Sequence, residues 1–140
     1  MRYCLAFAVF IMLLSQNLSA QYCTPPTSTT AITPTTTTQF TATFPAGTAP
    51  VFTFTATAGC TYTFATCGLS SVDTYLRIYN AAGALVQGWD DQCGFLQTNA
   101  VWLCNTSGPY SIQLSQFFCN PLYGPATVSY STTCPTTSCT

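Results

Sequence analysis

The stretch SVDTYLRIYNAAGALVQGWDDQCG, residues 71–94, decides the fold that the sequence predicts. Apolar residues alternate with polar and aromatic ones along residues 73–79, and this period of two indicates a strand with one buried face. The segment NAAG follows, and its Gly83 can adopt the positive φ that a tight turn requires. We therefore predict a β-hairpin in which residues 74–79 and 84–89 pair around this turn.

The same stretch holds nearly all the charge of the chain. The 140 residues include only three acidic ones, Asp73, Asp90 and Asp91, and no histidine. If the hairpin forms, all three acids meet at its open end, where like charges repel and raise the pKa of each carboxyl. Arg77 lies four residues along the strand, about 13 Å from Asp73 at roughly 3.3 Å per residue, which is too far for a direct ion pair. Another group must therefore compensate the three carboxylates.

A bound cation is one candidate for this compensation. Calcium takes 6–8 oxygen ligands from carboxylates, amide carbonyls and backbone carbonyls. We predict Asp73, Asp90 and Asp91 as candidate calcium ligands, and the side chains that can complete the shell are Asn80, Gln92 and Asn99. The alternative is that Asp73 and Asp90 accept backbone hydrogen bonds and cap turns, as aspartate often does.

The rest of the chain repeats the strand pattern without any convincing helical period. Threonine alternates with aromatic or small residues along residues 40–66, and similar alternation recurs along residues 99–132. We count about eight short strands separated by turns rich in glycine, proline and asparagine. This pattern predicts an all-β, antiparallel β-sandwich of the jelly-roll or Greek-key kind over residues 40–140. The Thr/Pro-rich residues 21–39 are expected to form an extended N-terminal arm, with an irregular strand along a sheet edge as the alternative.

The N-terminus predicts export from the cell. Residues 1–20 combine Arg2, an apolar run over residues 4–14 and a small residue, Ala20, which is the pattern of a secretory signal peptide cleaved before Gln21. The apolar run is shorter than the ~20 residues needed to span a bilayer. We therefore expect a secreted, extracellular protein with no membrane insertion after cleavage.

Cysteine usage agrees with an extracellular location. The chain has nine cysteines, and removal of Cys4 with the signal peptide leaves eight, an even number that predicts four disulfides. A zinc site is disfavoured because the chain has no histidine and no pair of CxxC units with finger-like spacing.

Composition excludes several function classes. Beyond the signal peptide the chain has one arginine and no lysine, so the basic footprint that nucleic-acid binding needs is missing. With no histidine or lysine, a serine or cysteine nucleophile has no usual base. Asp90 and Asp91 are adjacent in an extended chain and would point to opposite sides. We therefore predict that the protein is not an enzyme.

Three segments together resemble a known family. GCTYTFATCG, SVDTYLRIYNAAGALVQGWDDQCG and SGPYSIQLSQF follow one another in the order typical of the bacterial pre-peptidase C-terminal domain, in its cysteine-containing version from secreted Bacteroidetes proteins. The matching positions, which fall within residues 50–130, are Tyr62, Phe64, Asp73 to Tyr79, Gly83, Asp90, Asp91 and Gly108 to Ile112. Trp89 departs from the family, in which a small polar residue is usual.

This resemblance implies a jelly-roll sandwich, calcium at the three aspartates and a disulfide between Cys67 and Cys93. We further expect that Cys104 and Cys119, which flank a predicted hairpin, pair with each other. A Cys23–Cys134 bond would tie the N-terminal arm to the last strand.

The predicted function is a non-catalytic accessory module that binds an extracellular polysaccharide or protein, including in adhesion. Trp89, Tyr75, Tyr79 and Tyr123 are the candidate ligand-binding residues, because exposed aromatic rings stack on sugars and pack on proteins. The competing interpretation places the tryptophans in the core. A structural or surface-coat protein without a specific ligand is the alternative function, and the Thr-x-Thr repeats add ice binding as a minor variant of it.

Overall fold

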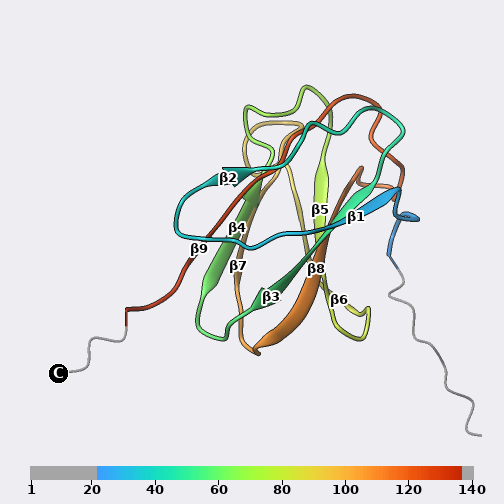
Figure 1. Cartoon of the computed structure of the whole chain (residues 1–140). Helices are drawn as coiled ribbons and strands as arrows, with labels where there is room; N and C mark the ends of the chain where they lie inside the picture. Colours follow the sequence, from blue (N-terminus) through green and yellow to red (C-terminus); the bar gives the residue numbers. More distant parts are fainter. Residues whose placement is uncertain (1–21, 137–140) are drawn as a thin grey trace, which may run out of the picture.

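The computed structural model describes residues 22–136 and shows two stacked β-sheets (Figure 1). The described residues form nine strands and no helix, so none of them forms a helix that could cross a membrane. The strands are β1 (Ser28–Ala31), β2 (Gln39–Phe40), β3 (Pro50–Ala56), β4 (Thr61–Ala65), β5 (Tyr75–Asn80), β6 (Leu85–Asp90), β7 (Asn99–Leu103), β8 (Gly108–Ser115) and β9 (Ser129–Thr133). The predicted all-β sandwich is confirmed. The signal peptide lies outside the described residues.

Five strands form one sheet in the order β1-β3-β8-β5-β6, and four form the other in the order β2-β9-β4-β7. Every strand pair is antiparallel except β1 with β3, which run parallel along the edge of the five-stranded sheet. Sequential strands often lie in different sheets, as when β3 and β4 or β7 and β8 cross from one sheet to the other.

The hairpin predicted from residues 71–94 is formed by β5 and β6. Its register places Tyr75 opposite Asp90 and Leu76 opposite Trp89. At the closed end, the backbone N–H groups of Ala82 and Ala84 both donate to the side-chain oxygen of Asn80, each at 3.0 Å. This Asx-type turn, together with the positive φ of Gly83, fixes the pairing and so determines which side chains meet at the open end.

The core lies between the two sheets and consists of alternate residues from both. Its largest fully buried side chains include Phe52, Phe64, Leu76, Ile112 and Leu114. Each such side chain contributes about 1.5–3 kcal/mol through removal from water. Within the part of the chain that the structure describes, the core contains no charged side chain, and the charged side chains lie on the outer face and at the ends of the sheets.

The N-terminal arm is built into the sandwich. After Cys23, whose N–H donates to the Tyr79 hydroxyl at 2.9 Å, the chain crosses the outer face of the five-stranded sheet. There Thr24 and the fully buried Gln113 exchange two hydrogen bonds, one at 3.3 Å and one at 2.6 Å. The arm then continues as β1 beside β3, so residues 22–39 cover a sheet face and extend its edge.

Among residues 22–136, three disulfides join Cys23 to Cys119, Cys60 to Cys134 and Cys67 to Cys93. The Cys67–Cys93 bond implied by the family resemblance is therefore present. The predicted Cys104–Cys119 pair is wrong, because the eight residues of β8 separate these cysteines by roughly 26 Å of extended chain.

The predicted Cys23–Cys134 pair is also wrong, because the two cysteines lie on different sheets. Cys23 sits on the five-stranded sheet, whereas Cys134 follows β9 in the other sheet and bonds to Cys60. Cys104 is buried beside this bond, its N–H donating to the Cys60 carbonyl at 2.9 Å, and it has no disulfide partner among residues 22–136. Cys139 lies outside the described residues.

Candidate functional site: an acidic corner and an aromatic end

The hairpin brings the three acids of the chain together as predicted. Asp73 precedes β5, Asp90 is the last residue of β6, and Asp91 begins the following turn with a φ of 55°. One carboxylate oxygen from each residue can be chosen so that all lie within 4.8 Å of one another. We call these three residues the acidic corner.

Burial and mutual repulsion raise the pKa values of two of these groups. The pKa of Asp73 is raised by burial and, to a smaller extent, by the charge of Asp91. The pKa of Asp90 is raised by burial and by both other aspartates, and the charge of Arg77 opposes this only in part. The acidic corner is therefore an unfavourable place for three negative charges unless a cation joins them.

The two partly buried carboxylates have unmet hydrogen-bonding capacity. One oxygen of Asp73 and one of Asp90 are shielded from solvent and receive no hydrogen bond from residues 22–136. A turn-capping carboxylate would accept backbone N–H groups there, so this geometry does not support the turn-capping alternative. A shielded oxygen without a donor costs about 1–3 kcal/mol, and coordination to a cation would offset that cost.

Three carboxylates provide part of a calcium shell, and the structure narrows the choice of further ligands. Asn80 is not one of them, because it lies at the opposite end of β5 and its oxygen serves the hairpin turn. The other two predicted ligands lie elsewhere: Gln92 is exposed and follows Asp91 directly, and Asn99 is the first residue of β7, opposite Ala65.

Arg77 does not neutralise the acidic corner. Its guanidinium is buried and donates to the Ser115 hydroxyl at 2.8 Å and to the carbonyls of Gln116 and Phe117 at 3.2 and 2.5 Å. It also stacks over the Tyr75 ring, 3.9 Å from the centroid. Burial lowers the pKa of Arg77. The only arginine of the described chain thus fixes the start of the loop between β8 and β9.

The structure separates the predicted ligand-binding aromatics into two groups. Trp89 and Tyr79 are only 7% and 2% exposed, so the prediction that they present a binding surface is wrong. Trp89 packs in the core on the same face as its cross-strand partner Leu76, and Tyr79 is covered by the N-terminal arm. Tyr75 is half-buried against Phe117, and Tyr123 is 57% exposed.

Exposed apolar side chains gather around the start of β5, next to the acidic corner. The hydroxyl of Tyr123 accepts a hydrogen bond from the Asp73 N–H at 3.0 Å, and the N–H of Thr74 donates to the Leu96 carbonyl at 2.9 Å. Phe95 is 95% exposed and Phe118 is 81% exposed. We call the five exposed residues of this region the aromatic end: Phe95, Leu96, Phe117, Phe118 and Tyr123.

Sequence reasoning missed four of these five residues. They lie in the loops between β6 and β7 and between β8 and β9, where no periodicity indicates which side chains face solvent. The available signal was the dipeptide Phe117-Phe118, which stands in a loop between Gln116 and Cys119 rather than in a strand.

A scan against models of known protein families and a search of curated proteins give no match for this chain. Solved structures share its fold. It is similar to PliG of Aeromonas hydrophila, a periplasmic inhibitor of g-type lysozyme, with 20% identity over 76% of this chain and 96% of that one and a TM-score of 0.54. It is also similar to the pre-peptidase C-terminal domain of a collagenase from Bacillus anthracis, with 13% identity over 78% of this chain and 97% of that one and a TM-score of 0.53.

Both likenesses concern the fold, which is a β-sandwich in each case. The resemblance to the pre-peptidase C-terminal domain that the motifs predict is confirmed for the fold.

Proposed function

We propose that the chain is a secreted, non-catalytic module that binds a protein partner through its aromatic end, and that calcium in the acidic corner orders this surface. The observation that carries the proposal is the exposure of Phe95 and Phe118, at 95% and 81%, in a region where three further apolar side chains are exposed. Phenylalanine is enriched at protein interfaces, and clustered exposed apolar groups mark interaction sites.

The loops that carry these rings are fixed at their bases. The Cys67–Cys93 disulfide anchors the loop containing Phe95. The segment Phe117-Phe118 is anchored on both sides. The guanidinium of Arg77 binds the backbone carbonyls before Phe118, and the Cys23–Cys119 disulfide follows directly after it. A surface that is ordered before binding loses less conformational entropy in a complex. Exposed phenylalanines on loops anchored in this way therefore favour a binding role over an incidental loop composition.

Calcium fits as an ordering ion in this proposal. Asp73 bonds through its backbone to Tyr123 of the aromatic end, and Asp91 begins the loop that carries Phe95. An ion held by all three carboxylates would therefore connect β5, β6 and both aromatic loops. The chemistry of the donor set, which is carboxylate oxygen only, suits a hard cation such as calcium.

The fold likeness and the disulfides are consistent with this proposal. PliG, with the same fold, is a periplasmic inhibitor of a lysozyme, so such a sandwich can act on a protein without catalysis. Three disulfides among the described residues favour an oxidising compartment, extracellular or periplasmic.

A matched pair of variants tests the proposal. The immobilised mature chain is incubated with secreted and surface proteins of its own organism, and retained proteins are quantified by mass spectrometry. The double variant F95S/F118S removes the two most exposed rings. The control L85S/L103S removes two leucines, 57% and 53% exposed, at the opposite end of the sandwich.

We expect proteins that are retained by the unsubstituted chain and by the control and are lost with F95S/F118S. Retention of nothing above the bare support would contradict the proposal and favour the structural-protein alternative. Equal retention by all three chains would place binding outside the aromatic end.

A further inference from the structure

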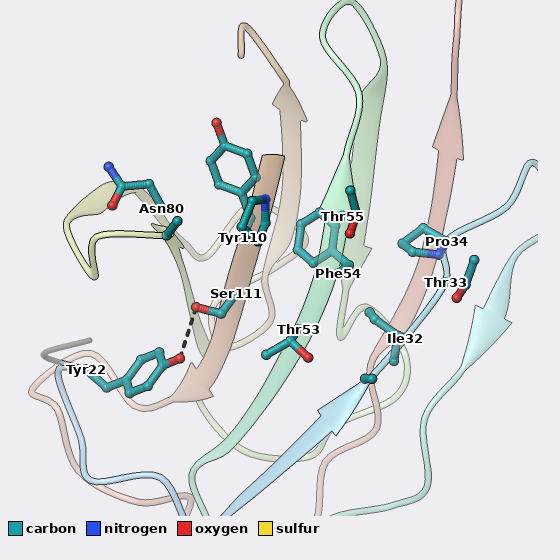
Figure 2. A pocket seen from close by; sticks show the side chains of 13 residues that line it. Tyr22, Ile32, Thr33, Pro34, Thr53, Phe54, Thr55, Asn80, Tyr110 and Ser111 are labelled. Atoms are coloured by element: carbon teal, nitrogen blue, oxygen red, sulfur yellow. Dashed lines mark hydrogen bonds between the residues drawn. The ribbon is translucent and has the colours of Figure 1, made fainter. Parts of the chain in front are cut away.

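We infer that the outer face of the five-stranded sheet carries a second binding site, a groove that takes a neutral polysaccharide chain. Figure 2 shows this groove over the middle of β3, with Tyr22, Asn80 and Ser111 on one side and Ile32 and Pro34 on the other. It has a volume of about 640 Å³, within the range of small-molecule sites. The inference is independent of the aromatic end, which lies at the other end of β5.

The groove contains no charged side chain. Its lining consists of aromatic, aliphatic, hydroxyl and amide groups, and all three acids of the chain lie in the acidic corner. The nearest basic side chain on this face, Arg77, is buried and fully engaged with the loop after β8. A phosphate, sulfate or carboxylate would find no cation here, and a basic ligand would find no anion. The lining therefore favours an uncharged polar ligand.

One tyrosine ring, that of Tyr22, is held in place at the groove. Tyr22 packs edge-on against Tyr79 at 5.0 Å, and its hydroxyl donates to Ser111 at 3.1 Å. Tyr110 adds no ring to the groove, because it pairs directly with the core residue Phe54 and its ring packs against the buried Trp102 at 4.7 Å. The ring of Tyr22, fixed in this way, supplies apolar contact area for the C–H face of a sugar at little entropic cost.

The groove also offers hydrogen-bonding groups that the protein itself leaves unused. The oxygen of Asn80 accepts two backbone N–H groups of the hairpin turn, which orients its amide nitrogen and leaves that nitrogen without an acceptor among residues 22–136. The hydroxyls of Thr53 and Thr55 project from β3 along the floor of the groove and make no side-chain hydrogen bond within the described chain. Oriented, unpaired donors near a fixed ring match the C–H and O–H groups on the surface of a sugar.

The shape of the face favours a chain over a single sugar. A second hollow of about 380 Å³ lies beside the first and shares Asn80, Ala81, Pro109 and Tyr110 with it. The two hollows form one path that runs from the end of β1 over β3 and β8 to the hairpin turn. A polysaccharide segment can follow this path, with its reducing and non-reducing ends both outside the groove.

The first test is affinity electrophoresis in gels containing one of three neutral polysaccharides, dextran, laminarin or mannan, or one of two anionic ones, alginate or heparin. We expect the chain to be retarded by at least one neutral polymer and by neither anionic one. Retardation by no neutral polymer, or equal retardation by the anionic ones, would overturn the inference.

The second test locates the site by titration calorimetry with oligosaccharides of the retarding polymer. Thr55→Val keeps the β-branched shape and removes the hydroxyl, and Asn80→Asp keeps the acceptor for the turn and removes the amide donor. Each is expected to weaken binding at least fivefold. The control Thr63→Val makes the same change on the outer face of the other sheet and should leave the affinity unchanged.

If Thr55→Val and Asn80→Asp bind as tightly as Thr63→Val, the groove is not the site and the inference fails. The variant F95S/F118S is expected to keep its saccharide affinity, so that failure of the protein-binding proposal and failure of this inference can be told apart.

Discussion

Removing one carboxylate from the acidic corner should have opposite effects on the metal-free and the calcium-bound protein. The ligand oxygens of the three aspartates lie within 4.8 Å of one another, so each pair repels by about 0.9 kcal/mol even at the dielectric constant of water. Asp91→Asn removes two of the three pairs. Because Asp90 and Asp91 are neighbours in the sequence and repel in the unfolded chain too, the pair with Asp73 contributes most, and we expect the metal-free variant to be about 1 kcal/mol more stable than the unsubstituted chain. Asparagine suits this position because Asp91 has a φ of 55°, which asparagine tolerates well.

Calcium should reverse this order. An ion present at 100 times its dissociation constant stabilises the folded chain by about 2.7 kcal/mol, and loss of one carboxylate ligand should remove most of that effect. Since 1 kcal/mol shifts the melting temperature of a domain of this size by about 4 °C, the unsubstituted chain should gain roughly 10 °C on addition of calcium and the variant little.

Differential scanning calorimetry with and without calcium measures both effects, and tryptophan fluorescence, to which the buried Trp89 beside Asp90 contributes together with Trp102, provides a second readout. Chelation of the calcium is the control and should restore the metal-free melting temperatures. The reasoning is refuted if the metal-free variant melts at or below the temperature of the unsubstituted chain, or if calcium leaves both unchanged.

The acidic corner, the hairpin and the arm each give a further prediction. Two carboxyls of the acidic corner, those of Asp73 and Asp90, have pKa values raised above the ordinary aspartate value of 3.8. The folded metal-free chain therefore binds more protons than the unfolded chain. The stability of the metal-free protein should consequently fall as the pH rises above 3.8. Calcium competes with these protons, so melting temperatures measured over the same pH range in excess calcium should rise instead. Gly88→Ala places a methyl group about 2.5 Å from the Tyr75 hydroxyl oxygen, so the Tyr75 ring must move. We expect this displacement to lower the free energy of unfolding in urea by about 1–3 kcal/mol and to weaken partner binding. Unchanged stability would contradict the close packing of Tyr75 on Gly88. The double variant C23S/C119S removes a disulfide between residues 96 positions apart. Its free energy of unfolding should fall by up to about 4.7 kcal/mol, and its N-terminal arm should become sensitive to limited proteolysis. Protease resistance equal to that of the unsubstituted chain would argue against the anchoring role of this disulfide.

The hairpin and the acidic corner were predictable because they depend on local sequence. A period of two identifies the strands, the turn at residues 80–84 fixes their register, and the register brings Asp73 to Asp90 and Asp91. The burial of Trp89 follows from the same register, because directly paired residues lie on one face of a sheet and its partner Leu76 is apolar. The prediction that placed Trp89 at a binding surface did not use this consequence.

The remaining features depend on contacts between distant segments. Tyr79 points away from the core, and only the N-terminal arm, 56 residues away in the chain, covers it. The disulfides of Cys23 and Cys134 depend on which sheet each segment joins, and strand periodicity carries no such information. Phe95 and Phe118 lie in loops whose exposure is set by the disulfides and by Arg77 rather than by any repeating pattern.

Site-specific photo-cross-linking tests the proposed function most directly. A photoreactive phenylalanine analogue replaces Phe118 in one chain and Leu103, at the opposite end of the sandwich, in the other, and both chains are irradiated with secreted and surface proteins of the organism. A cross-linked product that forms from position 118 in the presence of calcium and does not form from position 103 is the predicted result. No product from position 118, or the same products from both positions, would contradict binding through the aromatic end.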